Sequence, residues 1–107
     1  MKKALFLSLF LSLLLLISSS VQAAGDAEAG KAKTATCVAC HGPAGVSVNP
    51  LWPSLAGQKD QYLIKQMKAF RDGGRPDPMM SPMAKPLSDQ DIEDLAAYYS
   101  QLSCSGE

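Results

Sequence analysis

Cys37-Val38-Ala39-Cys40-His41 is the stretch that decides the fold of this chain. The pattern C-x-x-C-H is the attachment signature of a covalently bound haem c. Two thiols with two residues between them fit one helical turn, so both sulfurs can bond to one edge of the macrocycle while the adjacent histidine lies under the iron. The motif therefore predicts one haem c per chain, held by thioethers from Cys37 and Cys40, with His41 as the proximal iron ligand.

Two other chemistries use a C-x-x-C pair and remain alternatives. A thioredoxin-type site follows an apolar strand in a βαβ unit, whereas residues 25–36 are rich in Ala, Lys and Glu. A structural zinc site needs four nitrogen or sulfur ligands, and the chain offers only the motif and the distant Cys104. The residues therefore favour haem attachment over both.

The N-terminus predicts export. A basic start, Lys2-Lys3, precedes an apolar run at residues 4–17, and residues 21–23 fit a small-residue cleavage site. We predict a cleavable secretory signal peptide at residues 1–23 and a single domain at residues 24–107. An uncleaved membrane anchor is the alternative, although the run is short for a span of ~20 residues. Because haem c is attached outside the cytoplasm, we expect a periplasmic protein of a Gram-negative bacterium, with no stable membrane insertion after cleavage.

Charge and size narrow the function further. Without Lys2 and Lys3, eight Lys plus Arg residues oppose ten Asp plus Glu residues, which leaves a formal charge of −2. No basic stripe marks a nucleic-acid surface, so we expect no nucleic-acid partner. A domain of this size lies near the lower limit for a self-sufficient core, and a covalent apolar disc would complete it.

The spacing of apolar residues predicts an all-α fold with three main helices. The first spans Asp26 to about Cys40 and is rich in alanine. The second runs from about Lys59 to Asp72, and the third starts at Ser88, which forms a capping-box pattern with Asp91. Residues 75–86 hold four prolines and three methionines, so we expect them to be extended and irregular. The buried face of the third helix is predicted to comprise Ile92, Leu95, Ala96, Tyr99 and Leu102.

This order of helices and motifs resembles the class I c-type cytochromes. It is most similar to the small bacterial cytochromes of the c-four and c-five kind, and to one half of a dihaem c-four cytochrome. The resemblance implies a small cytochrome c fold, with three main helices wrapped around one haem, and a soluble one-electron carrier. The residues that carry it are Gly25-Asp26, Gly30-Lys31, 37–42, 53–58, Tyr62, Met79-Met80, 87–92 and 96–99.

The resemblance also implies a sixth iron ligand. In similar cytochromes a methionine precedes the apolar residue at the head of the last helix by seven positions, and Met80 lies seven positions before Leu87. Met80 is therefore the predicted distal ligand, with Met83 as the fallback and Met79 as the remaining loop candidate. Met67 belongs to the apolar stripe of the second helix, where methionine fills the core.

Related cytochromes place a proline twelve residues after the haem histidine, and its carbonyl accepts the Nδ1–H of that ring. Pro53 stands at this spacing from His41, so the resemblance assigns it this role; an ordinary turn proline is the alternative. Trp52 and Tyr62 could donate hydrogen bonds to the haem propionates, or they could be core aromatics with satisfied polar ends.

Three function classes follow. The leading one is a carrier of single electrons between redox proteins, such as a quinol-oxidising complex and a terminal oxidase or reductase. Iron filled by His41 and Met80 would leave no substrate site, so no catalytic residue is predicted. The alternatives are a haem subunit docked permanently on a larger dehydrogenase or oxidase, and a haem enzyme or sensor with a displaceable sixth ligand. Cys104, the odd cysteine, could link two copies or remain a bystander thiol.

Overall fold

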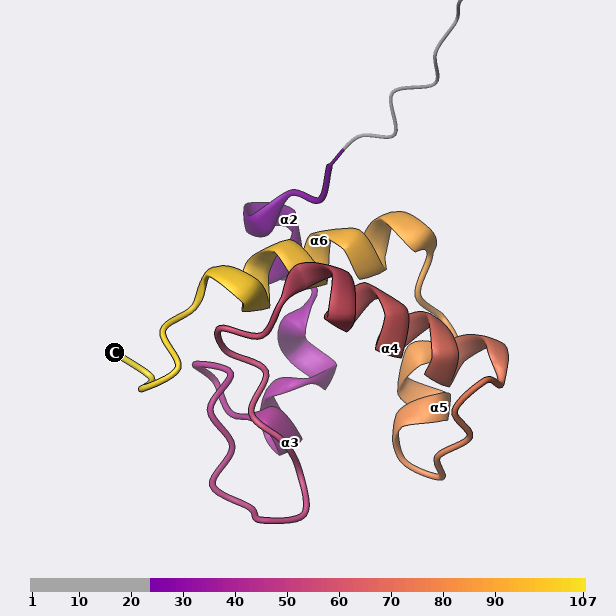
Figure 1. Cartoon of the computed structure of the whole chain (residues 1–107), viewed down its shortest axis with the longest axis horizontal. Helices are drawn as coiled ribbons and strands as arrows, with labels where there is room; N and C mark the ends of the chain where they lie inside the picture. The colour runs from indigo at the N-terminus through magenta and orange to yellow at the C-terminus, as the bar shows by residue number, and fades with distance from the viewer. Residues whose placement is uncertain (1–23) are drawn as a thin grey trace, which may run out of the picture.

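A computed structural model describes residues 24–107; the predicted signal peptide at residues 1–23 lies outside the described residues. No strand occurs among residues 24–107, so the all-α prediction is confirmed, and α4 and α6 are the two long helices (Figure 1). The elements are α2 (Ala27–Ala32), the 3-10 turn η1 (Thr34–Thr36), α3 (Val38–His41), α4 (Asp60–Asp72), α5 (Met80–Ala84) and α6 (Asp89–Gln101).

The two long helices agree with the sequence prediction. α4 ends at Gly73, whose φ of 90° is a left-handed conformation that glycine adopts without steric cost. α6 begins after Ser88, whose hydroxyl accepts the Asp91 N–H at 3.0 Å. The Asp91 carboxylate in turn accepts the Ser88 N–H at 3.0 Å, which completes the capping box.

The prediction of one continuous helix from Asp26 to about Cys40 is wrong, because the segment is divided into α2, η1 and α3. The backbone departs from α-helical geometry at Lys33, where φ is −100° and ψ is 2°. Next to it, the Thr34 hydroxyl donates to the Lys31 carbonyl at 2.9 Å. Hydroxyl side chains that bond to nearby backbone groups compete with the helical pattern in this way, and the alanine content of the segment does not reveal it.

The prediction of an irregular segment is also wrong for residues 80–84, which form α5. Its start is fixed by the Asp77 carboxylate, which accepts the N–H of Met80 at 2.7 Å and of Met79 at 2.8 Å. These two bonds lower the pKa of Asp77. Pro82 falls in the first turn of α5, where a helix does not use the missing N–H.

The core lies between α4 and α6. Leu63 of α4 packs with Leu95, Ala96 and Tyr99 of α6, and Ile92 is also fully buried. α2 packs against α6, and α5 packs against α4. Figure 1 shows α3, its following loop and α5 on the same side of the α4–α6 pair. The two segments that carry the predicted iron ligands therefore project from one face of the helix pair.

α2 crosses α6 with the two backbones close together. A Cβ atom at Gly30 would collide with the carbonyl of Asp94, and one at Gly25 would collide with the carbonyl of Glu93. Only glycine leaves room for this approach. The crossing fixes the start of the chain segment that leads to Cys37.

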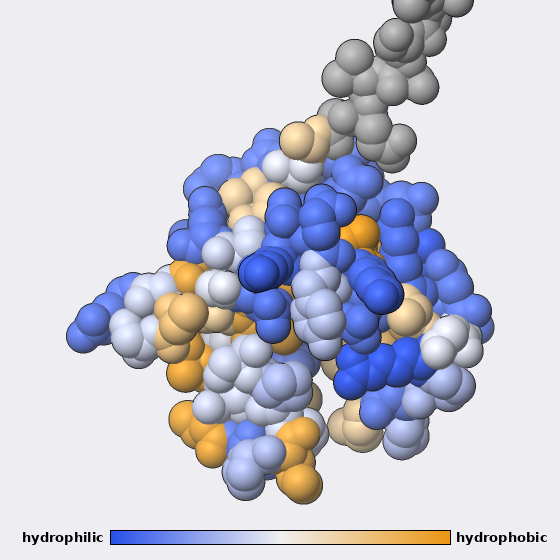
Figure 2. Space-filling model, in the orientation of Figure 1, coloured by the Kyte–Doolittle hydropathy of each residue, from blue (hydrophilic) through white to orange (hydrophobic). Residues whose placement is uncertain are grey.

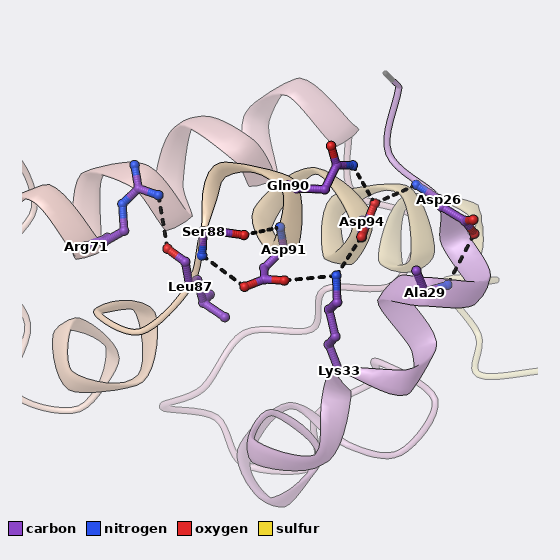
Figure 3. A network of polar contacts seen from close by, with 9 residues as sticks. All are labelled: Asp26, Ala29, Lys33, Arg71, Leu87, Ser88, Gln90, Asp91 and Asp94. Atoms are coloured by element: carbon purple, nitrogen blue, oxygen red, sulfur yellow. Dashed lines mark hydrogen bonds and ion pairs between the residues drawn. The ribbon is translucent and has the colours of Figure 1, made fainter. Parts of the chain in front are cut away.

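The buried carboxylate of Asp94 links α6 to the segment that contains α2 (Figure 3). The side chain of Asp94 is 4% exposed, and it accepts hydrogen bonds from the Asp26 N–H at 2.8 Å, the Lys33 Nζ at 2.6 Å and the Gln90 amide at 2.9 Å. Lys33 also pairs with Asp91 at 2.9 Å. The hydrogen bond from Asp26, followed by that from Lys33, lowers the pKa of Asp94 to about 2. The charged carboxylate is thus the form that the folded chain stabilises.

We expect Asp94→Asn to lower the free energy of unfolding by about 2 kcal/mol at neutral pH, because it leaves the Lys33 ammonium without its buried partner. A pKa that is lower in the folded state gives stability that is present above the unfolded pKa of about 3.9 and is lost as the pH falls toward about 2. The difference between Asp94→Asn and the wild-type protein should therefore narrow between pH 4 and pH 2. Urea unfolding of the holoprotein across this range measures it.

Asp89→Asn is the matched control on the same helix. Asp89 pairs with Arg71 and Lys68, but its side chain is 56% exposed, and exposed ion pairs contribute about 0–1 kcal/mol. Equal losses of stability in the two variants, or a constant difference across the pH range, would show that burial of Asp94 does not carry the effect.

Candidate haem-binding site

The C-x-x-C-H motif forms a single helical turn. Cys37 is the N-cap of α3, and its carbonyl accepts the N–H groups of Cys40 at 3.3 Å and His41 at 2.9 Å. Both thiols are unpaired and partly buried. The turn closes at Gly42, whose φ of 86° turns the chain into the loop that follows. The motif is therefore presented as the haem-attachment prediction requires, with its two sulfurs free to react.

His41 is buried, at 6% exposure, and its two ring nitrogens have different surroundings. Nδ1 lies 2.7 Å from the carbonyl oxygen of Pro53. A carbonyl only accepts, so Nδ1 carries the proton and Nε2 presents a lone pair. Nε2 is buried without a hydrogen-bond partner in the part of the chain described. An unsatisfied buried acceptor is costly, and an imidazole lone pair in this state fits an axial bond to haem iron.

The loop after α3 holds the Pro53 carbonyl in place. The Gly45 carbonyl accepts the N–H groups of Leu55 at 2.8 Å and Ala56 at 3.0 Å, which draws the two ends of the loop together. The Ser54 hydroxyl accepts the Ser47 N–H at 2.9 Å across the loop. Pro53 thus sits in a closed, internally bonded segment, which is the support that orients a histidine ligand of a metal.

The four candidate methionines differ in exposure. Met79 is 57% exposed and Met83 is 49% exposed, whereas Met80, the first residue of α5, is partly buried. Met67 packs against the core of α4 and α6, as its place on the apolar stripe predicts. Met80 is therefore the candidate on this loop whose side chain is turned most toward the protein.

The two aromatic residues that were candidates for contact with the haem propionates differ in exposure. Trp52 is partly buried, while Tyr62 is 49% exposed and is not a core aromatic. Residues 24–107 contain no group of three or more His, Cys, Asp or Glu side chains arranged for a metal ion. None of the helices in this range has the length and apolarity of a membrane span.

Sequence reasoning missed one polar group beside the motif. The Tyr99 hydroxyl is buried. Among the described residues, it and His41 Nε2 are the two buried side-chain nitrogen or oxygen atoms without a hydrogen-bond partner. The helical spacing placed Tyr99 on the buried face, but it did not show where the hydroxyl would point. The available signal was a tyrosine at a position that phenylalanine or leucine could fill, because a buried tyrosine hydroxyl normally has a partner.

Comparison with known proteins agrees with this geometry. The family model for cytochrome c matches residues 27–103. The chain is 54% identical over 80 residues to cytochrome c-554(548) of Halomonas halodenitrificans, an alignment that covers 72% of this chain and 96% of that protein. It is 48% identical over 99 residues to cytochrome c4 of Pseudomonas aeruginosa, covering 91% of this chain and 49% of the relative.

A solved structure shows the same architecture. The crystal structure of reduced recombinant cytochrome c4 from Pseudomonas stutzeri superposes with a TM-score of 0.72 at 48% identity, covering 75% of this chain and 47% of that one. This chain therefore spans about half the length of the cytochrome c4 relatives it matches and nearly the whole of the shorter one.

Proposed function

This chain belongs to the cytochrome c family, and from that premise we propose that it is a periplasmic protein that passes single electrons between redox proteins of a respiratory chain through iron bound by His41 and Met80. Membership makes it a monohaem electron carrier with covalently bound haem c. When bound, haem c supplies a reversible one-electron couple whose potential depends on the axial ligands. The residues of the chain would attach the haem, orient it and shield it from solvent.

The arrangement around His41 is the observation that carries the proposal. Its Nδ1–H donates to Pro53 at 2.7 Å, which fixes the ring orientation and the tautomer. Its Nε2 is buried and has no partner among residues 24–107, so a bond to iron would remove an energetic cost rather than add one. Cys37 and Cys40, as free thiols on the same turn, support attachment at that place.

Met80 completes the proposed ligand set. It is the least exposed of the loop methionines, and α5, which it begins, lies on the same side of the α4–α6 pair as α3 (Figure 1). A thioether ligand opposite a histidine raises the reduction potential. Filling both axial positions leaves no site for a substrate, which suits a protein whose task is to move an electron.

Export supports the periplasmic location. The basic start, the apolar run and the cleavage pattern within residues 1–23 are those of a secretory signal peptide. The relatives named above are bacterial proteins. We propose that cleavage after Ala23 releases a domain that begins at Ala24.

A permanently docked subunit is the second candidate, and one surface feature favours it. Val48 is 101% exposed and Leu51 is 85% exposed on the loop after α3, and hydrophobic side chains gather along the lower edge of the face shown in Figure 2. Exposed apolar patches often mark sites of protein contact. Cys104, which is exposed and unpaired, could also join two copies covalently.

The test is purification from periplasm followed by spectra, mass measurement and gel analysis. We expect a mature chain starting at Ala24 that carries one haem through denaturation and acid–acetone extraction, with reversible one-electron reduction. Size-exclusion chromatography should recover the protein free of a larger complex, and a non-reducing gel shows whether Cys104 links two copies. Complete extraction of the haem, or a Cys37–Cys40 disulfide in the mature chain, would contradict attachment.

A further inference from the structure

Tyr99 lies where the long helix α6 meets the loop that carries Pro53. Its side chain is 3% exposed and belongs to the core cluster with Leu63 and Leu95. A Cβ at Gly45 would lie 3.1 Å from the Tyr99 ring, and the Tyr99 carbonyl accepts the Gly57 N–H at 3.0 Å. The ring thus packs in the core between α4 and α6 and lies close to Gly45 of the loop, while the backbone of Tyr99 is bonded to Gly57.

The hydroxyl of this rigid ring has no hydrogen-bond partner in the described structure. A buried hydroxyl that is left unsatisfied destabilises the folded state. Burial raises the pKa of Tyr99, and the Cys37 thiol raises it further. Cys37 also packs directly against the core cluster that contains Tyr99. Cys37 of the C-x-x-C-H motif therefore brings a sulfur to the cluster in which the Tyr99 hydroxyl has no partner among the described residues.

Attachment changes what that sulfur can do. A thiol can donate a hydrogen bond, but a thioether sulfur has lost its hydrogen and can only accept, weakly. A tyrosine O–H is a donor. We propose that, in the holoprotein, the Tyr99 hydroxyl donates a hydrogen bond to the thioether sulfur of Cys37. This proposal rests on the proposed function only in requiring that Cys37 carries the thioether.

Tyr99 then acts as a positioning residue for the redox centre. A donor at the sulfur draws electron density away from the attached macrocycle, and the positive end of the O–H dipole stabilises the reduced, less positive iron. Both effects favour the ferrous state. Hydrogen bonds and burial around a redox centre are among the means by which a protein sets its potential.

Tyr99→Phe removes the donor and keeps the ring. We expect the haem to remain covalently attached and the protein to remain folded, while the midpoint potential falls. At a fixed electrode potential, the ferric-to-ferrous ratio should rise about twofold, as expected for the loss of a fraction of a net hydrogen bond. Tyr98→Phe is the matched control, because Tyr98 is the adjacent residue and its ring stacks edge-on against Tyr99 at 5.2 Å. It should leave the potential unchanged.

NMR of the reduced wild-type protein tests the same contact without any substitution. The buried Tyr99 hydroxyl proton should exchange slowly and show a nuclear Overhauser effect to the β-protons of Cys37. An effect to the propionate methylenes instead, or a potential that is equal in Tyr99→Phe and wild type, would overturn the proposal. A wild-type chain without covalent haem would refute attachment itself, which the haem-stained gel distinguishes from failure of the Tyr99 contact alone.

Discussion

Cys37→Ala/Cys40→Ala should abolish the cooperative fold of this domain. The described part of the chain buries few large apolar side chains, with Ile92 and Leu95 the largest that are fully buried. At about 25 cal/mol per Å² of apolar area, losing contact with both faces of a haem forfeits several kcal/mol. The whole stability of a small domain is only about 5–15 kcal/mol. Near-ultraviolet circular dichroism and thermal melting should show a chain that retains some helix without fixed tertiary packing.

Controls separate loss of haem from loss of a thiol. Cys104→Ala removes an exposed thiol of the same kind and should melt like the wild-type protein. Cys40→Ala keeps one thioether site and should be intermediate between the double variant and the wild type. A double variant that still unfolds cooperatively near the wild-type temperature would show that the helices alone supply the core, and the role of haem in folding would have to be abandoned.

Helix α6 could be predicted from the sequence because its information is local. Ser88 and Asp91 form the capping box three residues apart, and the apolar residues that follow repeat at helical spacing. Of the residues predicted for its buried face, Ile92, Leu95, Ala96 and Tyr99 are buried. Leu102 is only partly buried because it lies beyond the last turn, at the C-cap of the helix.

The two wrong elements also have local causes, but these depend on hydroxyl and carboxylate geometry rather than on apolar spacing. Thr34 turns its hydroxyl back to the Lys31 carbonyl and interrupts the first helix. Asp77 does the opposite, since its carboxylate gathers the N–H groups of Met79 and Met80 and starts a helix in a proline-rich stretch. In both segments the structure depends on which backbone group the polar side chain bonds to, and residue composition does not predict that partner.

The candidate site also has parts that could be predicted from the sequence and parts that could not. A motif of five residues predicted the turn that carries Cys37, Cys40 and His41, and the resemblance to class I c-type cytochromes implied the contact between His41 and Pro53. The contact between Lys33 and Asp94 joins residues 61 positions apart, and the placement of the Tyr99 hydroxyl depends on how α6 packs against the loop. Such contacts are consequences of the tertiary fold, so no local sequence pattern predicts them.

The choice among the methionines depended on register, and the described structure adds exposure as a separate criterion. Met79 and Met83 keep about half of their surface in solvent, whereas Met80 is partly buried. The Met80 N–H is also held by Asp77 at 2.7 Å, which fixes the start of α5. A ligand must be held in one orientation to bind iron, and Met80 combines a fixed backbone N–H with the less exposed side chain.

We expect Met80→Ala to have the largest effect on the iron. The oxidised wild-type protein should be low-spin and show a weak near-infrared absorption band that arises from sulfur-to-iron charge transfer. Met80→Ala should abolish this band, lower the reduction potential and open the reduced iron to carbon monoxide. The reason is that only a sulfur bonded to iron gives the transition, and loss of a thioether ligand removes its preference for the ferrous state. Absorption spectra and redox titration of the oxidised and reduced holoproteins measure all three effects.

Met79→Ala and Met83→Ala are matched controls, since each removes the same side chain from a neighbouring position. Both should keep the band and the potential, because an unbonded sulfur only packs. If Met83→Ala alone loses the band, the ligand lies three residues further along α5, and the register argument fails while electron carriage stands. A wild-type protein that is high-spin and binds carbon monoxide readily would defeat the carrier proposal itself, because an iron with an open sixth position is suited to ligand chemistry rather than to electron transfer alone.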